Sequence, residues 1–250
     1  MFVHNIDPTL LHLGPFEIRY YGLVYVIGFL LAYYFLNKKK KDLNLTKDDV
    51  ESYILYLMIS VIVGARLFEV LFWEPGYYFS NPIKILAIWE GGMAFHGSLV
   101  GVVLVTYFFC KRKKSSFAKL ADIIVIPAVF ALALGRIANF INGELWGTVT
   151  NVSWCVKFSA ADGCRHPSQL YGALKRFIIF GVLLALNRKK HKPGFLFWIF
   201  IFLMGVGRFF LDFVREDLRF LGLSLGQYFS LAMVIISLIV LAKYYRTELN

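Results

Sequence analysis

The chain is 250 residues long, 58% of them hydrophobic and 18% aromatic, and its mean hydropathy is +0.63. Soluble domains of this size are nearer half apolar, so the composition argues against a soluble globular protein. The net charge of +11 would indicate nucleic-acid binding in a soluble protein, but here the lysines cluster between apolar blocks, as in the cytoplasmic loops of membrane proteins. We therefore expect no nucleic-acid partner.

Seven apolar segments follow one another along the chain, and several exceed the ~18 residues that suggest a membrane span. They cover residues 17–36, 50–72, 88–110, 120–141, 168–186, 194–213 and 223–242. The sequence therefore predicts an all-α polytopic membrane protein, with residues 1–250 forming a single integral membrane domain. The long loop at about 142–167 predicts a small extracytoplasmic head between the fourth and fifth segments.

Lysine and arginine are distributed unevenly among the loops. Sixteen lie in the first, third and fifth loops and the C-terminal tail, against four in the loops after the fourth and sixth segments. Because basic residues are retained in the cytoplasm, this bias predicts a multi-pass protein of the cell (inner, cytoplasmic) membrane with its N-terminus outside and its C-terminus in the cytoplasm. The polar ends of the fourth, fifth and sixth segments then face the outer leaflet, away from cytosolic cofactors such as ATP.

Charged side chains inside apolar segments need a partner or a cavity, because each costs ~2.5–3.5 kcal/mol on insertion scales. Arg66 and Glu69 are three residues apart on one helix face, so we expect them to form a buried ion pair. Asp122 follows Lys119 at the cytoplasmic boundary and is expected to be an interfacial charge.

The fourth segment ends in GRIANFINGELWG, which places Arg136 and Asn139 on one helix face that Gly143 continues. Arg208 lies at a similar depth in the sixth segment. Two guanidinium groups at one interface form a good clamp for a phosphate, because each presents paired donors. The alternative is that both arginines extend to the outer lipid headgroups.

The third segment contains WEGGMAFHGSLVG, in which small residues surround His96. Small residues allow helices to approach closely and leave room for a ligand. His96 is either a group that transfers protons near neutral pH or a histidine that is hydrogen-bonded between helices. Tyr20 and Tyr21, near the outer end of the first segment, are typical of interfacial aromatic residues.

No metal or organic cofactor is expected. The histidines are scattered without the spacing of a zinc site, and the chain has no glycine-rich phosphate loop. Cys155 and Cys164 both lie in the predicted outer loop, where thiols meet an oxidising compartment, so we expect them to form a disulfide. Cys110 lies at the cytoplasmic end of its segment and is expected to stay reduced.

Six segments together resemble the prolipoprotein diacylglyceryl transferase family along nearly the whole chain. They are IDPTLLHLGPFEIRYYGLVYVIGF, GARLFEVLF, AIWEGGMAFHGSLVG, GRIANFINGELWG, RHPSQLY and SLGQYFS. The resemblance implies seven spans with the N-terminus outside. It also implies transfer of the diacylglyceryl group of phosphatidylglycerol to the lipobox cysteine of a prolipoprotein signal peptide, with a thioether formed and glycerol phosphate released. Phosphatidylglycerol, the precursor and the surrounding membrane lipids are then the expected partners.

The resemblance also implies which residues act. The expected catalytic residues are His96, Tyr21, Arg136 and Arg208. The expected substrate-binding residues are Arg136, Asn139, Asn142, Glu144, Gly147 and Arg208. The thiolate is the nucleophile, and its proton could be taken by His96, by Tyr21 or by the substrate itself.

The chain departs from the family pattern at four positions. Gly172 replaces a usual glutamate, Met204 a usual tyrosine, Asp212 a usual glutamate and Ser98 a usual glycine. Two other functions therefore remain open from the sequence. One is a transporter of anionic lipids, and the other is an inactive relative that only binds lipoprotein precursors.

Overall fold

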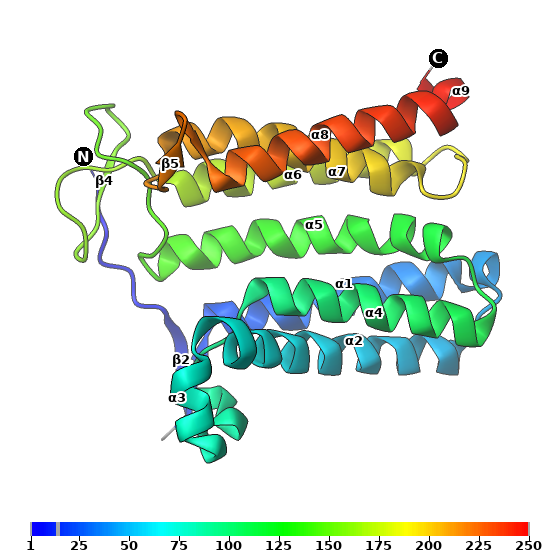
Figure 1. Ribbon diagram of the computed structural model, residues 1–250, viewed down its shortest axis with the longest axis horizontal. Coiled ribbons are helices and arrows are strands. Elements are labelled where there is room, and N and C mark those ends of the chain that lie inside the picture. The colour runs from blue at the N-terminus through cyan, green and yellow to red at the C-terminus, as the bar shows by residue number, and fades with distance from the viewer. Residues whose placement is uncertain (1, 14–15, 250) are drawn as a thin grey trace. The chain divides into compact units, whose positions relative to one another are not determined.

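The computed structural model describes residues 2–13 and 16–249, and most of them are helical (Figure 1). Six helices within these residues are long and apolar enough to cross a membrane. They are Tyr20–Leu43, Lys47–Trp73, Phe117–Ile141, Ser168–Leu186, Phe195–Val214 and Leu225–Tyr244. This finding confirms the predicted all-α, multi-pass membrane architecture.

The spans consist of α-helices, three of which continue into short turns of another helix type. The α-helices are α1 (Tyr20–Lys39), α2 (Lys47–Phe68), α5 (Phe117–Ile141), α6 (Ser168–Leu186), α7 (Phe195–Leu211) and α8 (Leu225–Tyr244). The continuing turns are η1 (Lys40–Leu43), η2 (Glu69–Trp73) and η5 (Asp212–Val214). A final short helix, α9, covers Arg246–Leu249.

The sequence predicted the third span over residues 88–110, but the helix there begins later, at Phe95. The helix there, α4, covers Phe95–Lys113 and ends in a basic turn, and it is not among the six apolar spans. The residues before it form a short 3-10 turn, η4 (Ile88–Glu90), followed by Gly91 and Gly92 with φ of 93° and 69°. Because left-handed backbone cannot continue a right-handed helix, the two glycines delay its start.

Internal contacts divide the chain into two compact units, and each is described by itself. Unit 1 comprises Met1–Leu31 and Ala121–Asn250, and unit 2 comprises Ala32–Leu120. The expectation of one integral membrane domain over residues 1–250 stays a prediction.

In unit 2, α2 and α4 pack backbone against backbone. A Cβ atom on Gly97 would collide with the carbonyl oxygen of Gly64, and the converse collision would occur at Gly64. The Ser98 hydroxyl donates to the Val61 carbonyl at 2.9 Å across the same contact. The small residues around His96 therefore do allow close helix approach, as the sequence indicated.

The expected ion pair between Arg66 and Glu69 is wrong. Arg66 is 5% exposed, and its guanidinium donates to main-chain carbonyls and to the Tyr78 hydroxyl instead. The carbonyls belong to Lys84, Ile85, Ala87, Gly91 and Gly92. These residues lie in the connection from α2 to α4, which includes α3 (Pro75–Ser80) and η3 (Pro82–Leu86). The guanidinium of Arg66 has five N–H donors, and the free carbonyls of this irregular backbone provide more acceptors than a single carboxylate would.

In unit 1, α5 presents a fully buried face and α7 packs closely against α8. Ile126, Val129 and Ala133 on α5 have no exposed surface. Gly205 on α7 lies so close to α8 that a Cβ atom there would be 3.1 Å from the Ser230 carbonyl oxygen. Near the start of α5, the Asp122 carboxylate accepts from the N–H groups of Gly194 and Phe197 at 2.6 and 2.8 Å. Asp122 is thus more than an interfacial charge, since it caps the first turn of α7.

The head of unit 1 combines the N-terminus with the loop between α5 and α6. Strand β1 (Phe2–Val3) pairs in parallel with β4 (Val156–Lys157), as Figure 1 shows at the N-terminus. Cys155 and Cys164 form a disulfide with their Cα atoms 5.6 Å apart, which confirms the predicted bridge. Two hairpins complete this unit: β2 (Thr9–Leu13) with β3 (Phe16–Arg19), and β5 (Arg219–Phe220) with β6 (Leu223–Ser224).

We predict that Asp122→Ala lowers the thermal stability of the detergent-purified protein. The change leaves two N–H groups at the start of α7 without their acceptor, and loss of a helix cap costs ~1–2 kcal/mol. Differential scanning fluorimetry should show a lower Tm, by about 2–4 °C per kcal/mol. Lys119→Ala removes a nearby exposed charge and serves as control. An equal Tm for both variants would contradict the capping role.

Candidate active site

The polar turn after α5 is built around Glu144. The helix ends at Ile141, and Gly143 and Leu145 then adopt φ of 67° and 57°. The buried Asn139 donates its amide to Oε1 of Glu144 at 2.7 Å, and Asn142 donates to the same oxygen at 3.3 Å. Oε2 has no hydrogen-bond partner among the described residues, so it remains available as an acceptor.

Two side chains at the start of α6 fix this turn. The Gln169 amide donates to the Glu144 carbonyl at 2.6 Å, and the Ser168 hydroxyl donates to the Leu145 carbonyl at 2.9 Å. Gln169 has no exposed surface. The turn is therefore held by two part-buried hydrogen bonds, which position the backbone that carries the Glu144 carboxylate.

Gly147 lies where the head meets the end of α7. Its N–H donates to the His166 carbonyl at 2.9 Å, and it forms a β-bridge with Arg215. A Cβ atom here would lie 2.9 Å from Cβ of His166 and would collide with the Val214 carbonyl oxygen. The structure thus gives Gly147 a packing role, and only glycine fits without a shift of backbone.

Arg208 is held at the end of α7 by a buried carboxylate. Its Nε lies 2.7 Å from Oδ1 of Asp212, which has no exposed surface. The Ser224 hydroxyl donates to the other oxygen of Asp212 at 3.1 Å. Nearby, Nε of Arg215 lies 3.2 Å from a carboxylate oxygen of Asp217. A second carboxylate, that of Asp217, lies 3.9 Å from a terminal nitrogen of Arg208. The other terminal nitrogen of Arg208 has no carboxylate partner among the described residues.

Arg136 is an unpaired cation at this end of unit 1. It makes no ion pair or side-chain hydrogen bond with any residue that the structure describes, and it is half-buried. Arg208, Arg215, Tyr21 and Asp212 lie within its electrostatic range. The structure therefore places three of the predicted catalytic residues, Arg136, Arg208 and Tyr21, in one part of unit 1, and it leaves the donors of Arg136 without a partner among the described residues.

The fourth predicted catalytic residue, His96, belongs to unit 2. It lies in the first turn of α4 and is exposed, with its ring stacked on Phe68 at 5.8 Å between centroids. Within the described chain its imidazole has no hydrogen-bond partner. The alternative of a histidine bonded between helices is therefore wrong, and both ring nitrogens remain free.

Sequence reasoning missed several polar residues of unit 1. Lys175 and Arg176 lie within the fifth predicted span, Arg215 follows the sixth, and Gln169 anchors the turn. The two cations of α6 could have been found by the same argument that identified Arg136, since they interrupt an apolar run. The roles of Gln169 and Arg215 depend on contacts between distant segments and leave no such signal.

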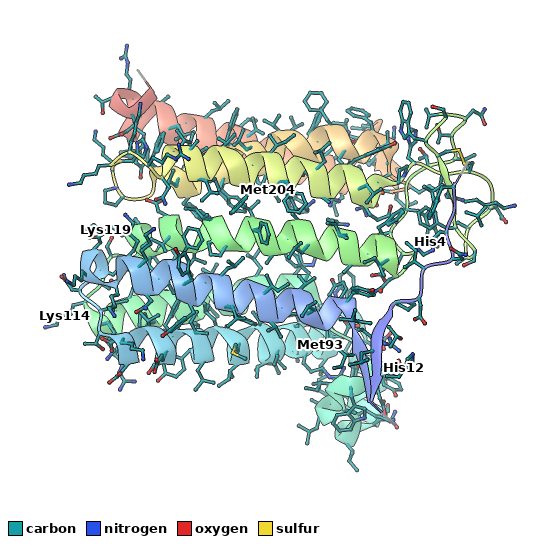
Figure 2. The ribbon with its side chains drawn as sticks, turned by 180° about the vertical axis from the view of Figure 1, so that it is seen from behind. His4, His12, Met93, Lys114, Lys119 and Met204 are labelled. Carbon is teal, nitrogen blue, oxygen red and sulfur yellow. A yellow bond between two sulfur atoms is a disulfide. The ribbon has the colours of Figure 1, made fainter. Side chains whose placement is uncertain are left out.

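The arrangement suits an anion with hydroxyl groups. Arg136 and Arg208 supply guanidinium donors, and Glu144, in the turn that follows α5, supplies a fixed acceptor. Among residues 2–13 and 16–249, no three His, Cys, Asp or Glu side chains gather to hold a metal ion. Figure 2 shows His4 beside the end of α5, where its ring lies against Gly143.

Comparison with known proteins identifies the relatives of the chain. Residues 8–243 match the family model of prolipoprotein diacylglyceryl transferase. The chain is 44% identical over 243 residues to the phosphatidylglycerol–prolipoprotein diacylglyceryl transferase of Geobacter sulfurreducens, covering 94% of each protein. It is 41% identical over 242 residues to the protein of the same name from Bordetella parapertussis, covering 92% of each.

We predict that Gly147→Ala destabilises the protein by ~1–3 kcal/mol, because the added methyl group overpacks the junction with His166 and Val214. Thermal unfolding in detergent should show the loss. The matched control is Gly181→Ala on α6, since a Cβ atom at Gly181 would meet nothing within 4 Å. A Gly147→Ala protein as stable as the control would refute the proposed crowding.

Proposed function

Because the chain belongs to the prolipoprotein diacylglyceryl transferase family, we propose that it binds the headgroup of phosphatidylglycerol at this end of unit 1. The enzyme transfers the diacylglyceryl group of phosphatidylglycerol to prolipoprotein. The binding site that we assign, here called the headgroup site, comprises Arg136, Asn139, Asn142, Glu144, Gly147 and Arg208. The observation that carries the assignment is the guanidinium of Arg136, which interrupts an apolar helix and has no ion pair or side-chain hydrogen bond among the described residues.

Each side chain of the headgroup site has a separate task. Arg136 and Arg208 grip the phosphate, because guanidinium presents paired donors to phosphate oxygens. Oε2 of Glu144 accepts from a headgroup hydroxyl, while Asn139 and Asn142 hold the other oxygen of the same carboxylate. Gly147 keeps the head close to the end of α7, which limits the room around the phosphate.

The reaction joins the lipobox cysteine of the precursor to the lipid. The cysteine thiolate attacks the glyceryl carbon that carries the phosphate, a C–S bond forms and the C–O bond breaks. The electron pair of the C–O bond goes to the phosphate oxygen, and glycerol phosphate leaves. The proton of the thiol goes to a base, for which His96 and Tyr21 are the two candidates in this chain. The free ring nitrogens of His96 support its candidacy.

The location of the reaction follows from the charge bias. The last turns of α1 and α4 carry Lys38 and Lys39, and Lys111, Arg112 and Lys113. These basic turns support a protein of the inner (cytoplasmic) membrane with the N-terminus outside. The headgroup site then faces the outer leaflet, where the exported precursor and membrane lipids meet.

We predict that the purified protein with phosphatidylglycerol adds a diacylglyceryl mass to a lipobox peptide and leaves its Cys→Ser version unmodified. Only the thiol can become the thiolate nucleophile near neutral pH. Mass spectrometry of both peptides measures the result. Labelling of neither peptide would support an inactive relative, and equal labelling of both would exclude the cysteine as acceptor.

We predict that Arg136→Lys and Arg208→Lys each lower transfer by roughly tenfold to a hundredfold, because lysine keeps the charge but loses the paired donors. Initial rates with phosphatidylglycerol micelles measure the effect, and thermal unfolding confirms that the variants fold. Arg188→Lys, an exposed position outside the headgroup site, is the matched control. Turnover near that of wild type in both variants would favour the view that the arginines only contact outer headgroups.

A further inference from the structure

Two cations of α6 have no role in the headgroup site as described. Arg176 is 6% exposed, and its terminal nitrogen donates to the Gly172 carbonyl at 2.8 Å within the helix. Its Nε is buried and has no hydrogen-bond partner. Lys175 is half-buried, and its Nζ is also buried without a partner among the described residues.

Two glycines bring these cations to the headgroup site. A Cβ atom on Gly172 would lie 3.1 Å from the guanidinium of Arg176 and 3.5 Å from Cγ and Cδ of Arg136. The two arginines share the space beside this glycine. On α7, Gly207 is crossed by the methylene chain of Lys175, whose Cγ would be 2.8 Å from an added Cβ atom. Lys175 therefore passes beside Arg208.

The charges around Lys175 do not balance. Arg136 on α5, Arg176 on α6 and Arg208 on α7 lie within its electrostatic range, and Asp212 is the acidic group among its neighbours. Arg136 and Arg208 also lie near Arg176, together with Arg215. Asp212 is already paired with Arg208 at 2.7 Å, and the other nearby carboxylate, that of Asp217, lies 3.2 Å from Arg215 and 3.9 Å from Arg208. Unpaired cations inside a membrane span typically mark the path of a charged ligand.

The transfer reaction provides an anion that fits this surplus. The phosphate of phosphatidylglycerol is a diester with one negative charge. When the C–O bond breaks, its electron pair stays on the phosphate, and the charge of the incoming thiolate is neutralised in the thioether. Glycerol phosphate therefore leaves as a monoester with up to two negative charges.

We propose that Lys175 and Arg176 bind the second negative charge that the phosphate gains, so that the site prefers a phosphate monoester dianion to a phosphate diester. This inference rests on the proposed function, because the monoester is the leaving group of the transfer. Lys175 and Arg176 act beside the clamp of Arg136 and Arg208, on the side of α6. They stabilise charge where it develops, and they retain the product after transfer.

The test compares two soluble anions that differ in this charge. Glycerol phosphate is a monoester, and glycerophosphoglycerol is the corresponding diester. Both are titrated as inhibitors of transfer and as ligands in isothermal calorimetry with the detergent-purified enzyme. The wild type should bind the monoester at least about tenfold more tightly than the diester, as expected for one added charged hydrogen bond. Equal affinities in the wild type would overturn the proposal without any variant.

The variants Lys175→Met and Arg176→Gln should each reduce the preference for the monoester by about tenfold, with a lower kcat and a smaller change of KM for phosphatidylglycerol. Lys175→Arg and Arg176→Lys keep the charge and should retain most of the preference. The control is Lys189→Met, which removes an exposed lysine outside the span. An unchanged preference in folded Lys175→Met and Arg176→Gln proteins would overturn the proposal.

Two further arms separate the possible outcomes. Phosphatidic acid in the micelles offers the same monoester on a lipid, and inhibition by phosphatidic acid without inhibition by glycerol phosphate would contradict the role in product binding. Calorimetry is independent of transfer. A protein that prefers glycerol phosphate in calorimetry but transfers nothing would refute the proposed function and uphold the anion site.

Discussion

The ion pair between Arg208 and Asp212 is the interaction on which the headgroup site depends. Asp212 has no exposed surface, and its two oxygens join Arg208 on α7 to Ser224 at the start of α8. Gly226 contacts the same carboxylate, and a Cβ atom there would lie 3.0 Å from the Arg208 guanidinium. The Arg208 side chain is 32% exposed, but its removal would leave the buried carboxylate of Asp212 without this cation, which is destabilising. The pair thereby fixes the direction of Arg208 and the packing of two helices together.

Three cations of unit 1, Arg136, Lys175 and Arg176, lie against glycines and have no carboxylate partner among the described residues. Gly172 makes room for Arg136 and Arg176, and Gly207 makes room for Lys175. A glutamate at position 172 would fill this space and neutralise one cation. The glycine therefore determines the size and the charge of the site at once. It is compatible with an active enzyme if an anionic ligand supplies the missing negative charge.

The sequence predicted features that depend on local patterns. Hydropathy located the spans, and the shared outer loop of Cys155 and Cys164 indicated the disulfide that the structure contains. Features that depend on contacts between distant segments were not predictable in this way. Helical spacing suggested that Arg66 pairs with Glu69. In the structure, the guanidinium of Arg66 instead donates to main-chain carbonyls of the connection from α2 to α4. The start of α4 was misplaced because hydropathy does not register the backbone conformation of Gly91 and Gly92.

Arg66 and Arg136 differ in whether their guanidinium N–H groups have hydrogen-bond partners inside the protein, and this difference distinguishes a structural arginine from a ligand-binding one. Both interrupt apolar helices, and the sequence alone gives each the same insertion cost. Arg66 is surrounded by main-chain carbonyls and the Tyr78 ring, so its donors are satisfied inside the protein. Arg136 has no such partner in the part of the chain that the structure describes, and Arg208, Arg215 and Asp212 are the charged side chains within its electrostatic range. The guanidinium of Arg136 is half-buried, so its unpaired donors are open to an anionic ligand. The unsatisfied arginine is therefore the one that fits a ligand, and the satisfied one holds the fold.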